Sequence, residues 1–179
     1  LWKKSIFKNL EDTLIGTPAL SGKLSSDGKI NIYAHNGFDE ILALNGDNGE
    51  ITWKKKHPLP FRGGITSSKG SVFVSDFDGN FLSIADKNGT TNWNTFLGSD
   101  YNSIYTTARS IIAQNKIVVP GTGGTFFVLS IDTGDVLWSE NISSNKQLPK
   151  IFHSGDIIAN PIYHEGIIYI VSQSGFTAA

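Results

Sequence analysis

The stretch Asn48-Gly49-Glu50-Ile51-Thr52-Trp53 joins a tight turn to a strand that ends in tryptophan. In every copy of this pattern glycine stands four residues before tryptophan, and the further copies are Asn88-Gly89-Thr90-Thr91-Asn92-Trp93 and Thr133-Gly134-Asp135-Val136-Leu137-Trp138. Leu1-Trp2 matches the end of an earlier copy, so all tryptophans of the chain hold one repeat position. The tryptophans at positions 2, 53, 93 and 138 are 51, 40 and 45 residues apart. This period is typical of the four-stranded blades of a β-propeller.

The residues between these turns supply the strands that such blades need. Asn-Gly and Asp-Gly accept the positive φ of hairpin turns, and Val, Ile, Phe and Tyr suit a half-buried pleated surface. The expected strands include residues 64–68, 71–75, 81–85, 116–120, 125–129 and 167–171. No segment keeps a helical apolar period with caps. We therefore predict an all-β fold with almost no helix, a β-propeller fragment of four-stranded antiparallel blades.

The repeat predicts three complete blades and parts of two others within the 179 residues. Residues 1–2 would end a preceding blade, residues 3–53, 54–93 and 94–138 would form blade units, and residues 139–179 would form a truncated blade. Closed propellers have about four to eight blades, so we expect the missing blades to come from a longer natural chain or from further copies of this one. The chain begins with Leu1 and has no methionine, so we expect the natural start, with any targeting segment or lipid anchor, to lie outside it.

The tryptophans are predicted to close the blades. In this structural role each ring packs between neighbouring sheets and its N–H bonds to a backbone carbonyl. The alternative, stacking on a flat cofactor, would need one special tryptophan rather than one in every blade. The structural role is therefore favoured for Trp2, Trp53, Trp93 and Trp138.

Composition and motifs argue against several functional classes. A formal net charge of −1 argues against a general binder of nucleic acid or anionic membranes, and the absence of cysteine excludes disulfides and thiolate chemistry. The histidines, His35, His57, His153 and His164, lack metal-ligand spacing and are interpreted as loop or surface residues. The glycine-rich stretch 121–124 links two expected strands, so it is predicted to be a hairpin turn rather than a phosphate-binding loop. We assign no catalytic, cofactor-binding or metal-binding residue.

The repeat resembles the pyrroloquinoline-quinone (PQQ) type of propeller repeat, in which Ala-Leu-Asp and a Thr-Gly turn lead to a strand ending in Leu-Trp. Residues 42–49 and 128–138 carry this match. Within the superfamily the chain is most similar to the BamB family, propeller lipoproteins of the outer-membrane β-barrel assembly machinery. That narrower resemblance rests on Leu59, Phe61, Arg62 and Gly63, which match an apolar, any, apolar, arginine, glycine pattern of the family.

The resemblance implies a binding role for this segment, because in the family it helps contact the periplasmic domains of the BamA-like barrel-forming partner. Leu59 and Phe61 would then supply apolar anchoring, and Arg62 would supply a directional charged hydrogen bond. Asp156, ahead of the Pro-containing strand start at 159–161, would add a complementary charge. Ile158 stands where the family tends to carry a second acid.

The residues by themselves leave two interpretations of the segment open. Apolar side chains beside an arginine in a proline-braced loop have the composition of a protein–protein hot spot. Alternatively, Leu59 and Phe61 fold down as a plug over the propeller face, and Arg62 pairs with a nearby carboxylate.

We predict a non-enzymatic scaffold without a cofactor, located in the periplasm and associated with the bacterial outer membrane. The main rival is a fragment of a PQQ-dependent quinoprotein dehydrogenase. Many such enzymes carry an adjacent cysteine pair and long insertions between strands, whereas this chain has no cysteine and compact blades. A ligand-sensing propeller module is a third class, against which only the Leu59–Gly63 segment argues.

Overall fold

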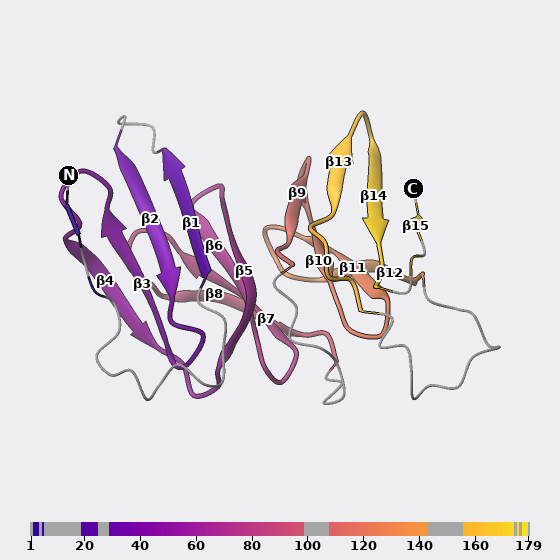
Figure 1. The fold of residues 1–179 in the computed structure, drawn as a ribbon, viewed down its shortest axis with the longest axis horizontal. Helices are drawn as coiled ribbons and strands as arrows, with labels where there is room; N and C mark the ends of the chain where they lie inside the picture. Colours follow the sequence, from indigo (N-terminus) through magenta and orange to yellow (C-terminus); the bar gives the residue numbers. More distant parts are fainter. Residues whose placement is uncertain are drawn as a thin grey trace.

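The computed structural model describes residues 2–3, 5, 19–24, 29–98, 108–142, 156–173, 175 and 177–178. Every regular element in these ranges is a strand, and the strands form four antiparallel sheets (Figure 1). Sheet 1 comprises β1 (Ala19–Leu24), β2 (Ile30–His35), β3 (Glu40–Asn45) and β4 (Ile51–Lys56), and sheet 2 comprises β5 (Phe61–Ser68), β6 (Ser71–Asp76), β7 (Asn80–Ala85) and β8 (Thr91–Phe96). Sheet 3 comprises β9 (Ile111–Ala113), β10 (Lys116–Pro120), β11 (Thr125–Ser130) and β12 (Val136–Asn141), and sheet 4 comprises β13 (Ile162–His164), β14 (Ile167–Val171) and β15 (Thr177–Ala178).

In every sheet the strands are hydrogen-bonded in chain order, so each sheet is a meander. The sheets also follow one another in chain order, and the two termini lie at opposite ends of the molecule (Figure 1). Sheets 1 to 3 each have four strands, and sheet 4 has three described strands. The predicted all-β propeller fragment is therefore confirmed. Lys4, His153 and Phe176 fall outside the described residues.

The turns lie at the two opposite ends of the strands, so the molecule has two distinct faces. The turn face carries the turns between third and fourth strands, at residues 46–50, 86–90 and 131–135. The loop face carries the turns between second and third strands, at residues 36–39, 77–79 and 121–124, and the connection from sheet 1 to sheet 2 at residues 57–60. Backbone hydrogen bonds join neighbouring segments within each face, for example from Asp86 N to Gly70 O and from Phe77 N to Pro60 O.

The third and fourth strands of sheets 1, 2 and 3 share one irregularity. In the β3–β4 pair the register shifts between Ala43 and Leu44, which leaves Thr52 as an extra residue on β4. Shifts of the same kind occur in the β7–β8 and β11–β12 pairs. Each is a β-bulge, which increases the local twist of the strand. The repeated spacing from glycine to tryptophan therefore contains both a turn and a bulge.

The hydrophobic core lies between the sheets rather than on one side of them. The middle strand β7 is buried along nearly its whole length, because sheet 1 covers one of its faces and sheet 3 covers the other. One cluster joins sheets 1 and 2 and includes Tyr33, Trp53, Phe61 and Val74. Two further clusters join sheet 2 to sheet 3 and sheet 3 to sheet 4. Because each of these three clusters is shared by two sheets, the position of each sheet depends on its neighbour.

Three of the four tryptophans also contact the next sheet along the chain. The indole Nε1 atoms of Trp2, Trp53 and Trp93 donate to the carbonyl oxygens of Gly46, Asp86 and Ile131, at 2.7, 2.7 and 3.2 Å. The same rings lie against the turn glycines Gly49, Gly89 and Gly134, where an added Cβ would approach ring carbons to 2.4, 2.8 and 2.6 Å. These glycines therefore have two constraints, a positive φ and the absence of space for a side chain.

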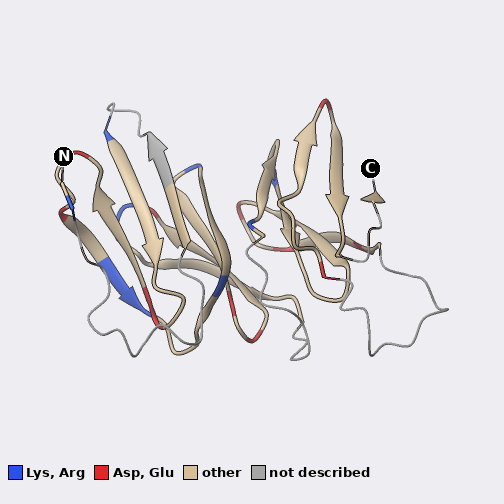
Figure 2. Cartoon of the chain, in the orientation of Figure 1, with Lys and Arg blue, Asp and Glu red and all other residues tan. Residues whose placement is uncertain are grey.

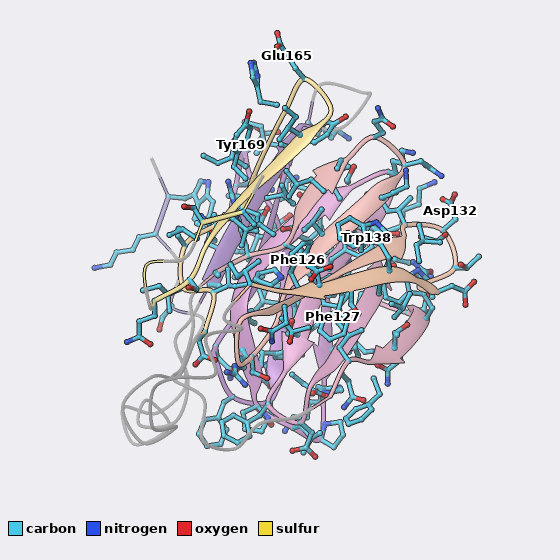
Figure 3. The ribbon with its side chains drawn as sticks, turned by 90° about the vertical axis from the view of Figure 1, so that its right-hand side faces the viewer. Phe126, Phe127, Asp132, Trp138, Glu165 and Tyr169 are labelled. Carbon is cyan, nitrogen blue, oxygen red and sulfur yellow. The ribbon has the colours of Figure 1, made fainter. Side chains whose placement is uncertain are left out.

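Trp138 differs from the tryptophans of sheets 1 and 2. It is 45% exposed, whereas Trp53 is 8% exposed. Its ring packs edge-on against Phe126 with the centroids 5.3 Å apart, and the two residues lie side by side on sheet 3 (Figure 3). Trp138 is therefore packed on its own sheet and only half covered.

The described part of the chain contains no helix that is both long enough and apolar enough to span a membrane.

Candidate functional site

The segment that sequence analysis predicted to be a loop is partly a strand. Strand β5 begins at Phe61, and its first residues pair with the end of β6, Phe61 opposite Asp76 and Arg62 opposite Ser75. A register irregularity follows between Arg62 and Thr66. The prolines at positions 58 and 60 suggested a loop up to Gly63, but the pairing partners come from a distant part of the sequence. Only residues 57–60 connect the two sheets.

The expectation that Phe61 anchors a partner directly needs correction. Its side chain is 2% exposed and belongs to the core between sheets 1 and 2. The ring lies between two histidine rings, with centroid distances of 5.4 Å to His35 and 5.1 Å to His57. Its amide donates to the carbonyl of Phe38 at 3.0 Å. Phe61 therefore supports the loop face from beneath, which is the plug interpretation for this residue.

His57 connects this aromatic stack to a buried carboxylate. The Nε2 atom lies 3.0 Å from Oδ2 of Asp76, whose side chain is fully buried. The other acceptor positions of the carboxylate are used by the amides of Asp78 and Asn80, at 3.0 and 2.9 Å, and by Asn80 Nδ2, at 2.7 Å. Asp76 thus joins the β6–β7 turn to the connection between sheets 1 and 2.

His35 is buried, which corrects its interpretation as a loop or surface residue. Its side chain is 1% exposed, its Nε2 lies 3.0 Å from the Gly63 carbonyl oxygen, and its Nδ1 accepts from the Gly37 amide at 3.0 Å. Because a carbonyl can only accept, these bonds assign the neutral ring with its proton on Nε2. Burial lowers the pKa of His35 to about 4, although the bond to Gly63 acts in the opposite direction.

Arg62 and Leu59 remain near the surface of the same face. Both are half-buried. Arg62 borders a cavity of about 180 Å³ between sheets 2 and 3, whose walls also include Asp76, Phe127 and Thr122. Of the sequence-predicted contact residues in this segment, Leu59 and Arg62 are therefore accessible, and Phe61 is not.

Asp156 is also buried, and its expected role as a surface charge is corrected. Its side chain is 0% exposed, and Oδ1 accepts from the amide of Gly123 at 2.8 Å. Its carbonyl oxygen accepts from the amide of Gln173. The carboxylate therefore fixes the β10–β11 turn, which borders the same cavity as Arg62 through Gly121 and Thr122. Ile158, by contrast, is 44% exposed.

The glycine-rich stretch 121–124 is a hairpin turn, as predicted. It connects β10 to β11, and the Gly121 amide donates to the Thr125 carbonyl at 2.8 Å. The Gly123 amide, which a phosphate would need, donates to Asp156.

Charges are distributed over the sheets without one dominant sign (Figure 2). Lys54 pairs with Glu40 at 2.7 Å, and Lys56 lies 3.5 Å from Asp39. Within the described ranges, no group of three or more His, Cys, Asp or Glu residues could hold a metal ion. On the loop face, Leu59 and Arg62 are half-buried and lie over a network formed by His35, His57, Phe61 and Asp76.

Sequence analysis missed the network beneath the face. Asp76 begins the turn sequence Asp76-Phe77-Asp78-Gly79-Asn80, and an aspartate in this position commonly bonds to amides two and four residues later. That signal was available. Nothing in the sequence indicated that His57 would reach the same carboxylate.

The structure defines the class of protein: a β-propeller fragment of meander sheets, with a tryptophan contact repeated between successive sheets. The chain belongs to the BamB family, because the family described as "Outer membrane protein assembly factor BamB" matches residues 1–179.

Individual relatives are similar at low identity. The outer membrane protein assembly factor BamB of Yersinia pestis is 21% identical over 156 residues, which is 87% of this chain and 39% of the relative. BamB of Moranella endobia is 20% identical, over 89% of this chain and 41% of the relative. The chain therefore spans about two fifths of the length of these curated relatives.

Solved structures show the same fold. The crystal structure of BamB from Moraxella catarrhalis has a TM-score of 0.76 and 20% identity, with 96% of this chain and 50% of that chain covered. A quinohemoprotein alcohol dehydrogenase from Pseudomonas putida HK5 has a TM-score of 0.66 and 18% identity, with 95% of this chain and 32% of that chain covered. At these identities each likeness shows the fold alone.

Proposed function

We propose that the protein is a non-enzymatic scaffold of the outer-membrane β-barrel assembly machinery, working in the periplasm at the outer membrane. Its proposed task is to hold the periplasmic domains of a BamA-like barrel-forming subunit. The observation that carries this proposal is the match of the BamB family to residues 1–179. A catalytic role would need a constellation of reactive groups, and the described residues offer packed turns and short connections instead.

The loop face is the proposed contact surface. Leu59 supplies apolar area, and Arg62 supplies a charged hydrogen-bond donor for a partner carboxylate or carbonyl. Phe61 and Asp156 contribute indirectly, because their side chains are buried beneath the face and fix its backbone. This division of roles assigns all four sequence-predicted residues to one face, Leu59 and Arg62 at its surface and Phe61 and Asp156 beneath it.

The quinoprotein alternative rests on fold likeness. The alcohol dehydrogenase neighbour shares the sheet arrangement at 18% identity. Among the described residues of this chain, no group of three or more His, Cys, Asp or Glu residues could hold a metal ion. The scaffold is the function that the chain supports best.

Binding to the partner tests the proposal. The purified protein is titrated with the periplasmic domains of the barrel-forming subunit from the same organism, and Arg62→Glu is compared with Lys116→Glu. Lys116 is exposed at the start of β10, next to the turn face, so its reversal controls for net charge. We expect Arg62→Glu to weaken binding about tenfold or more and Lys116→Glu to change it little. Equal affinities of the two folded variants would contradict the assignment of the loop face.

A further inference from the structure

The connection between sheets 1 and 2 has little backbone hydrogen bonding of its own. Pro58 and Pro60 have no N–H to donate. Backbone hydrogen bonds attach its two ends and one carbonyl: His57 N donates to Asp39 O at 2.7 Å, Phe61 N donates to Phe38 O at 3.0 Å, and Pro60 O accepts from Phe77 N at 2.8 Å. The position of Leu59 therefore depends on what holds His57 and Phe61 in place, and Arg62 directly follows Phe61 at the start of β5.

His57 makes two side-chain contacts that fix both ends together. The face of its ring stacks on Phe61, with centroids 5.1 Å apart and planes at 24°. Its Nε2 atom lies 3.0 Å from Oδ2 of Asp76. Its side chain is only 11% exposed, so both contacts lie largely out of water. One side chain thus links the start of the connection to its end and to the neighbouring β6–β7 turn.

Asp76 provides the fixed point for this link. Its carboxylate is fully buried and is already held by the Asp78 and Asn80 amides of its own turn. A buried carboxylate with several hydrogen bonds has little freedom to move, and a hydrogen bond to a charged group is stronger than a neutral one. The turn is therefore rigid where His57 reaches it.

We propose that His57 and Asp76 act as a pair of positioning residues that hold Leu59 and Arg62 in their partner-binding geometry. Neither residue needs to touch the partner. The pair reduces the conformational entropy that the connection would otherwise lose on binding, which is how preorganised surfaces gain affinity. This inference rests on the proposed function of the loop face and adds the residues that control it.

Two substitutions of His57 separate its contacts. His57→Phe keeps a ring to stack on Phe61 but removes the bond to Asp76, whereas His57→Gln removes the ring but keeps a donor that can reach the carboxylate. Asp132→Asn, on the turn face, is a control for the loss of one aspartate in a side-chain hydrogen bond. Amide hydrogen exchange is measured at Phe61 and Phe77, whose amides donate the hydrogen bonds that hold the connection, and at Val74 in the core.

We expect His57→Phe to accelerate exchange at Phe61 and Phe77 by about tenfold or more, with Val74 unchanged, because a charge-assisted hydrogen bond is lost locally. Partner binding should weaken in the same variant by about tenfold, while His57→Gln retains near wild-type exchange and binding. If His57→Phe fails to fold, the double variant His57→Phe with Asp76→Asn takes its place, because it removes the contact without leaving a buried charge unpaired.

A folded His57→Phe protein with wild-type exchange at Phe61 and wild-type binding would overturn the proposal. Accelerated exchange together with unchanged binding would also overturn it, since the contact would then hold the connection without affecting the partner. If the wild-type protein itself does not bind the partner, the proposed function fails. The exchange data would in that case still decide whether His57 and Asp76 fix the connection.

Discussion

At the residue scale, the aromatic rings of His35, Phe61 and His57 lie together between sheets 1 and 2. His35 was expected to be a loop or surface residue, and Phe61 was expected either to anchor a partner or to plug the propeller face; both are almost fully buried. Their burial has one cause, since each fills the space between sheets 1 and 2 where the other and His57 also lie. Residue type and local spacing carry no information on which side chains from distant segments meet. A histidine that is useful in the core therefore has the same local sequence signal as one in a loop.

The buried His35 makes stability depend on pH. Its folded pKa of about 4 lies below the ordinary value of 6.5, so the unfolded chain binds more protons between these values. The free energy of unfolding should therefore fall as the pH drops, by roughly 2 to 3 kcal/mol between pH 7 and pH 4.5 from this residue. Urea unfolding of the wild type and of His35→Gln, which does not titrate, measures the difference. Identical pH dependence in the two proteins would show that His35 does not contribute.

At the element scale, most strands were predictable, because hairpin glycines and β-branched runs mark them locally. The strands expected at 116–120 and 167–171 occur with those bounds as β10 and β14. The start of β5 was not predictable, because Phe61 joins the sheet by pairing opposite Asp76 and bonding to Phe38. The turn glycines were recognised only for their positive φ. Their second constraint, the tryptophan of the preceding sheet, comes from packing between elements.

The contact between a turn and the preceding tryptophan gives a matched pair of substitutions. Gly89 has a φ of +74° and an added Cβ would lie 2.8 Å from the Trp53 ring, whereas Gly70 has a φ of +78° and open space around it. Gly70→Ala should cost about 1 kcal/mol of unfolding free energy from the backbone conformation alone. Gly89→Ala should cost about 1 to 3 kcal/mol more, because the ring must shift. Urea unfolding measures the loss of unfolding free energy in both variants. Equal losses would contradict a close contact between the Trp53 ring and the turn at Gly89.

At the scale of the whole molecule, the repeat predicted the architecture, because a four-stranded meander takes a characteristic number of residues. The candidate site was reached differently. Its segment was found through a family resemblance carried by Leu59, Phe61, Arg62 and Gly63, and no physical pattern alone decided between a partner-binding loop and a plug. The structure shows elements of both, since Phe61 plugs the space between sheets and Leu59 and Arg62 stay accessible above it. Family membership supports the proposal that this surface serves outer-membrane protein assembly.

The most direct test of the scaffold account is a map of where the partner binds. Amide hydrogen exchange is measured for the free protein and for the protein with a saturating concentration of the periplasmic domains of the barrel-forming subunit. The account predicts new protection at Leu59, Arg62 and the 77–79 turn of the loop face, and none at Gly49 or Gly89 of the turn face. Protection confined to the turn face, or to neither face in a complex that does form, would contradict it.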